Sequence, residues 1–89
     1  MVRFTNSDIR RITNLTNNND HTSSRLFIAR KINSKSLVKE YSSIKSEQNR
    51  RGHLTSELSD RRNNADIKLK SALRRKTSNE DFNNIWGAL

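Results

Sequence analysis

The sequence predicts an all-α protein, a small bundle of about four helices joined by polar connections rich in Asn and Ser. Pro is absent and Gly occurs only at Gly52 and Gly87, so residues that break helices are rare. β-Branched and aromatic residues are sparse and never alternate over the length of a strand, which argues against a sheet. The twelve Asn and twelve Ser fall largely at the expected breaks between apolar segments.

An amphipathic helix is predicted over residues 7–15, because apolar side chains recur three positions apart at Ile9, Ile12 and Leu15. The polar run over residues 16–22 predicts a loop. A second helix should begin within residues 22–24.

The middle of the chain allows two interpretations, because its apolar stripe changes direction. Ile28 and Ile32 fix one stripe, whereas Leu37, Tyr41 and Ile44 fix another that is rotated from it. The polar residues 33–36 lie between the two stripes, and we expect a break there with Ser36 as a cap. The alternative is one long helix over residues 24–51 with two faces. In both cases Gly52 suits the left-handed position that ends a helix.

A long helix is predicted over residues 54–76. Its apolar stripe is clean at 100° per residue and consists of Leu54, Leu58, Ala65, Leu69 and Ala72. The chain should then break at Thr77 and Ser78, and a short helix should follow over residues 79–86 and end at Gly87.

The length of 89 residues predicts a single small helical domain over residues 1–89 with a thin core. Leu, Ile, Val and Phe together make up 20 of the 89 residues, just above the range in which a highly charged chain is disordered. Stabilisation by a partner or by dimerisation therefore stays open, and so does a basic chain that folds only on binding.

The formal net charge is +9, and it is unevenly distributed. Residues 25–51 carry eight bases against two acids, and residues 52–76 carry seven bases against three acids. Residues 77–89 carry two acids and no base. A basic centre of this kind indicates binding to a polyanion, with an ordinary solvated surface as the alternative.

Lys and Arg on helix faces opposite the apolar stripes, mixed with Ser and Asn, suit contacts to phosphates. On the helix expected from Ser36, with Lys35 projected back as if it were helical, this face carries Lys35, Lys39, Ser42, Ser46 and Arg50. The full set of predicted nucleic-acid contacts is Arg30, Lys31, Lys35, Lys39, Arg50, Arg51, Arg61, Arg62, Lys70, Arg74 and Arg75.

The order of residues 28–37 invites a helix-turn-helix interpretation, which we do not favour. No Gly stands at the usual turn, and the apolar spacing of the second helix does not match.

The acidic C-terminal segment, residues 77–89, carries an apolar face made of Phe82, Ile85, Trp86 and Leu89 at helical spacing. The face could dock into a groove of a partner protein. The alternative, which we favour, is that it completes the protein's own core. A third interpretation is that Glu80 and Asp81 fold back onto the basic helices and compete with nucleic acid.

Residues that would carry catalysis or bind metal are missing. There is no Cys, no Gly-rich phosphate loop and no His/Asp/Glu cluster at metal spacing, and we interpret His21 and His53 as surface residues. We therefore expect no enzyme activity, no cofactor, no metal and no small-molecule substrate. No apolar run suits a signal peptide or a membrane span, so we expect a cytoplasmic protein, with the nucleus or nucleoid left open.

Taken together, these features predict a small basic accessory protein that binds DNA or RNA through residues 25–76. The alternative is a protein–protein interaction module, such as an inhibitor or adaptor of a larger nucleic-acid-processing machine. Such a module would use its basic face and its aromatic C-terminal helix.

Overall fold

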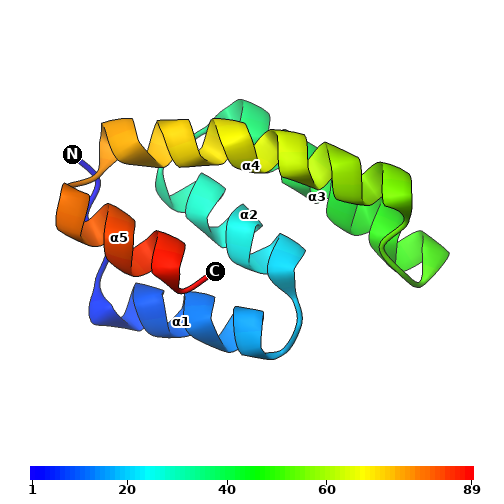
Figure 1. Ribbon diagram of the computed structural model, residues 1–89, viewed down its shortest axis with the longest axis horizontal. Helices are drawn as coiled ribbons and strands as arrows, with labels where there is room; N and C mark the ends of the chain where they lie inside the picture. Colours follow the sequence, from blue (N-terminus) through cyan, green and yellow to red (C-terminus); the bar gives the residue numbers. More distant parts are fainter.

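The computed structural model describes residues 1–89 (Figure 1). It contains five α-helices and no strand. The helices are α1 (Asn6–Asn17), α2 (His21–Lys31), α3 (Lys35–Arg51), α4 (Ser56–Lys76) and α5 (Asn79–Gly87). The all-helical prediction is confirmed, whereas the predicted number of about four helices is one too low.

The fifth helix arises because the chain breaks between α2 and α3, so the alternative of one long helix over residues 24–51 is wrong. Asn33 has a φ of 57°, in the left-handed region that Asn tolerates better than most residues. The N–H of Ser34 then bonds the carbonyl of Ala29 and closes the end of α2. Ser34, rather than the predicted Ser36, precedes α3.

Short polar side chains begin all four of the other helices, and at α2 the Asp20 carboxylate accepts a bond from the Ser23 N–H. Thr5 forms a capping box with Asp8 at α1, Thr55 accepts a bond from the backbone at α4, and Ser78 does so at α5. The cap at Thr55 starts α4 two residues later than predicted. Gly52 ends α3 with a φ of 80°, as the sequence predicts.

The helices pack in three layers. α2 and α4 contact each other in the middle, α3 covers them on one side, and α1 and α5 lie on the other. α3 contacts neither α1 nor α5. Figure 1 shows α3 and α4 side by side as a long hairpin whose closed end extends beyond the other helices. The molecule measures 36 × 24 × 16 Å.

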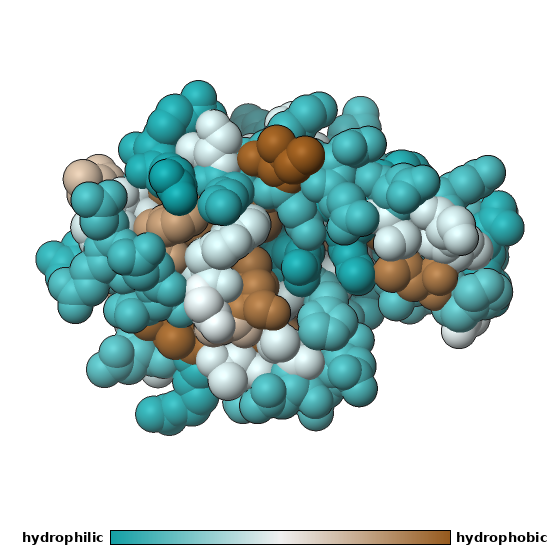
Figure 2. Space-filling model, in the orientation of Figure 1, coloured by the Kyte–Doolittle hydropathy of each residue, from teal (hydrophilic) through white to brown (hydrophobic).

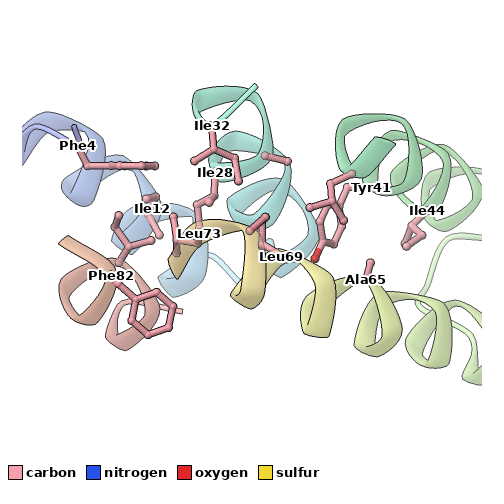
Figure 3. Close-up of a cluster of buried hydrophobic side chains, with 14 of the residues drawn as sticks. Phe4, Ile12, Ile28, Ile32, Tyr41, Ile44, Ala65, Leu69, Leu73 and Phe82 are labelled. Atoms are coloured by element: carbon pink, nitrogen blue, oxygen red, sulfur yellow. The ribbon is translucent and has the colours of Figure 1, made fainter. Parts of the chain in front are cut away.

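The core lies between these layers and takes side chains from all five helices (Figure 3). Fully buried examples are Ile12 of α1, Ile28 of α2, Tyr41 of α3, Leu69 of α4 and Ile85 of α5. Each aliphatic side chain of this kind stabilises the fold by about 1.5–3 kcal/mol relative to leaving it in water.

The N-terminal segment also packs against this core. The N–H of Val2 donates to the carbonyl of Lys76 at 2.7 Å, and the N–H of Phe4 donates to Asp81 at 3.4 Å. The Phe4 ring is buried. These contacts tie the segment to the junction of α4 and α5. None of the helices is long and apolar enough to cross a membrane.

Candidate nucleic-acid interface

One carboxylate, Asp66 of α4, organises the polar contacts in the interior. The Tyr41 hydroxyl donates to its Oδ1 at 2.6 Å, and the Nε of Arg25 donates to both of its oxygens at 2.9 Å. Figure 3 shows the Tyr41 ring pointing from α3 toward α4. Burial and the bond to Asp66 raise the pKa of Tyr41 well above its ordinary value. Arg25 therefore stabilises the packing of α2 on α4 through its bonds to Asp66.

Arg62, a predicted phosphate contact, lies beside this cluster and is half-buried. Its Nη1 donates to the Thr22 hydroxyl at 3.2 Å, and that hydroxyl donates to Gln48 at 3.0 Å. Its Nε is buried without a partner. Burial and the nearby charge of Arg25 lower the pKa of Arg62. Most of this side chain therefore faces the protein rather than a ligand.

Four further predicted contacts form ion pairs at the surface. Arg61 pairs with Glu40 at 3.0 Å, and Lys31 pairs with Asp8 at 3.2 Å. The other two are Arg50 and Arg51, which share Glu47. Exposed pairs contribute about 0–1 kcal/mol, so a stronger anion can compete for these bases. The Arg50–Arg51–Glu47 group also keeps an excess of one positive charge.

Six of the predicted contacts are exposed and form no ion pair, and the structure brings three of them together. Arg30 lies at the end of α2, and Lys35 and Lys39 lie on the first turns of α3. They line one shallow hollow together with Asn33 and Val38. A second hollow shares Arg30 and continues toward α1. The two hollows therefore form one continuous basic surface.

The second hollow contains two residues that the sequence-based site lacks. Arg11 of α1 holds its guanidinium 5.5 Å from the centre of the Phe27 ring, beside Arg30 and Lys31. Stacking on a ring covers one face of a guanidinium and leaves its N–H edge free for a phosphate. The doublet of Arg10 and Arg11 is visible in the sequence, but only the fold shows that α1 and α2 are neighbours.

The basic surface continues along the side of α3 that points away from the core. We call this side, made of Lys35, Lys39, Ser42, Ser46 and Arg50, the outer face of α3. Its Lys, Arg and Ser46 side chains are exposed, and Ser42 is half-buried. No helix other than α2 and α4 contacts α3. The structure thus presents this predicted face to solvent.

The remaining predicted contacts lie on α4, and two of them pack on α5. The Lys70 ammonium is 5.7 Å from the centre of the Trp86 ring, and the Arg74 guanidinium is 4.6 Å from that of Phe82. Both bases are exposed, as is Arg75. On the face in Figure 2, hydrophilic side chains dominate and apolar spots are isolated.

The four predicted docking residues of the C-terminal segment, three on α5 and Leu89 after it, face the protein's own core. Phe82 and Ile85 are buried, and Trp86 and Leu89 pack against the core while half-buried. The rings of Phe82 and Trp86 stack at 5.9 Å. α5 does fold back onto α4, but through these rings rather than through its acids. Neither Glu80 nor Asp81 forms a salt bridge.

No group of three or more His, Cys, Asp or Glu side chains is arranged to hold a metal ion. His53 is exposed, and its Nδ1 lies 3.2 Å from the Arg51 carbonyl oxygen. The chain matches no protein-family model, no curated protein and no solved structure. The functional argument therefore depends on the chemistry of the surface.

Proposed function

We propose that this protein is a small nucleic-acid-binding accessory protein that contacts phosphates through Lys and Arg side chains on its helix faces. The observation that carries the proposal is the continuous basic surface from Arg11 through Arg30 to the outer face of α3. Of its bases, only Lys31 and Arg50 have a carboxylate partner. Unpaired, exposed cations in a row suit a polymeric anion, because each phosphate that they contact releases condensed counterions.

The length of the surface also suits a polymer. Lys35 and Arg50 are 15 positions apart on α3, and a rise of 1.5 Å per residue separates them by about 22 Å along the helix axis. Stacked bases rise by about 3.4 Å each, so the outer face of α3 spans about six nucleotides of a strand. Ser42 and Ser46 lie between the bases and supply hydroxyl groups for hydrogen bonds to the nucleic acid.

The alternative function, a module that docks onto a protein partner through α5, has less support. Phe82 and Ile85, two of its four anchors, are buried among the protein's own side chains. Using them in a partner's groove would uncover the core at a cost of about 1.5–3 kcal/mol for each side chain. The basic surface needs no such rearrangement.

A titration with fluorescently labelled nucleic acid at several salt concentrations tests the proposal. The variant Lys35→Gln/Lys39→Gln removes two unpaired bases of the outer face of α3. A matched control, Arg3→Gln/Arg10→Gln, removes two exposed bases elsewhere, so that both variants lose the same net charge.

We expect wild-type protein and control to bind similarly at low salt. The α3 variant should bind more weakly, and its slope of log affinity against log salt should be shallower by about two units for a duplex. Equal losses in both variants would show that overall charge, not this surface, drives binding. Absence of salt-sensitive binding by the wild type would reject the proposed function.

A further inference from the structure

The outer face of α3 is not covered by another helix. α3 alone forms its layer, and it contacts only α2 and α4. Its buried residues are confined to one side, at Leu37, Tyr41 and Ile44. The opposite side therefore projects from the body of the protein along the whole helix.

The first two bases of the outer face are free of acids. Lys35 and Lys39 on the outer face form no ion pair. Of the two acids of the helix, Glu40 pairs with Arg61 of α4, whereas Glu47 pairs with Arg51 and with Arg50 at the far end of the outer face. An anionic ligand that approaches the first turns of the outer face thus meets two bases without a carboxylate partner.

The turn before α3 brings a third base beside this face. Asn33 turns the chain sharply with its φ of 57°, so that Arg30 at the end of α2 lines the same hollow as Lys35 and Lys39. An Asn in this conformation performs the role for which a Gly would be expected in a tight turn. The absence of Gly, which argues against a helix-turn-helix arrangement in the sequence, therefore does not prevent a tight connection.

We propose that α3 inserts into the major groove of duplex DNA, an inference that rests on the proposed nucleic-acid binding. A helix with its side chains is about 10–12 Å across, and the major groove of B-form DNA is about 12 Å wide and 8.5 Å deep. The short side chains of Ser42 and Ser46, in the middle of the face, let the helix backbone approach the base edges. Arg30 and Lys35 at one end, and Arg50 at the other, reach the phosphates.

The same geometry selects the ligand and predicts weak sequence preference. The major groove of A-form RNA is deep and narrow, and it excludes a helix. Duplex DNA is therefore the ligand, and duplex RNA is not. Ser hydroxyl groups both donate and accept hydrogen bonds, so Ser42 and Ser46 contact any base edge. Binding should depend far more on duplex form than on base sequence.

A competition between duplex DNA and duplex RNA of the same sequence and length, at one salt concentration, tests the inference. Methylation protection on the DNA adds a direct observation, because N7 of guanine lies in the major groove and N3 of adenine in the minor groove. The variant Ser46→Phe adds uncharged bulk to the middle of the outer face. The control Ser71→Phe adds the same bulk at an exposed position of α4.

We expect the RNA duplex to bind at least about tenfold more weakly than DNA, with protection at N7 but not at N3. Ser46→Phe should weaken DNA binding about tenfold, and Ser71→Phe should leave it unchanged. Equal affinity for both duplexes without N7 protection would overturn groove insertion and leave phosphate binding intact. Absence of binding to either duplex at low salt would overturn the proposed function itself.

Discussion

The Tyr41 hydroxyl of α3 donates a 2.6 Å hydrogen bond to Asp66 of α4, and Arg25 of α2 donates to both oxygens of the same carboxylate. Three helices thus meet at one side chain. The side chains of Arg25 and Asp66 are only 14% and 18% exposed, so water screens their attraction weakly. Because α3 carries the proposed interface, this contact holds the interface on the rest of the molecule.

Removing the carboxylate should destabilise the fold. We expect Asp66→Ala to lower the free energy of unfolding by about 2–3 kcal/mol, because Arg25 and Tyr41 lose their shared partner while largely buried. Tyr41→Phe should cost about 1 kcal/mol. Urea denaturation followed by circular dichroism measures both. Asp60→Ala, at an exposed position of the same helix, serves as control, and an equal loss there would contradict the assigned role of Asp66.

Tyr41 is the only tyrosine, so its titration can be followed by tyrosinate absorbance. Burial and Asp66 raise its pKa above the ordinary value of 10.0. The folded state thus holds this proton more tightly than the unfolded state. Its contribution to stability is complete below pH 10 and declines as the pH rises above 10. We expect tyrosinate to appear only as the protein unfolds, whereas ionisation near pH 10 in the folded state would contradict the buried contact.

Acid should weaken the fold through two carboxylates whose pKa values are lowered. The Thr5 N–H and Lys31 lower the pKa of Asp8. Burial alone raises the pKa of Asp20, but bonds from Lys45 and Ser23 outweigh it. Both groups stabilise the fold fully above their unfolded pKa near 3.8, and this contribution is lost as the pH falls through the lower folded values.

The urea concentration at which half of the protein is unfolded should therefore decrease when the pH is lowered below about 4. The double variant Asp8→Asn/Asp20→Asn should have a flatter dependence on pH, since it lacks the two protonation sites. Identical pH profiles for variant and wild type would show that other groups control acid unfolding.

The ring of Phe82 attaches α5 to the core, and its loss should release that helix. We expect Phe82→Ala to lower the free energy of unfolding by about 3–5 kcal/mol. It should also shift the Trp86 emission to the red in the folded protein, because the two rings stack at 5.9 Å. A Trp86 emission that is the same in native and fully unfolded wild type would mean that α5 is detached in solution.

Helix ends were predictable where one residue has a strong local preference. Gly52 and Ser78 mark ends of helices as expected, because a left-handed φ and a short capping side chain act within one turn. The break before α3 falls within the predicted residues 33–36, but the predicted cap, Ser36, lies two residues after the observed one, Ser34. The position of the break depends on Asn33 adopting a left-handed φ, and Asn does so less regularly than Gly.

The candidate site was predictable only in part. Periodicity placed Lys35 and Lys39 on a face opposite the core, because that follows from one helix alone. The pairing of Arg61 with Glu40 and the burial of Arg62 join helices that are far apart in sequence, so a pattern of charges cannot reveal them. The neighbouring positions of Arg11 and Phe27 depend on tertiary packing in the same way.

The salt dependence of binding to a short DNA duplex tests the central claim most directly. When the whole proposed surface is bound to DNA, five of its bases contact phosphates. They are Arg11, Arg30, Lys35, Lys39 and Arg50. Each phosphate neutralised contributes about −0.9 to the slope of log affinity against log salt. We therefore predict a slope of about −4 to −5 for the wild-type protein. A slope near zero, or no binding at low salt, would contradict the proposal that the basic surface binds nucleic acid.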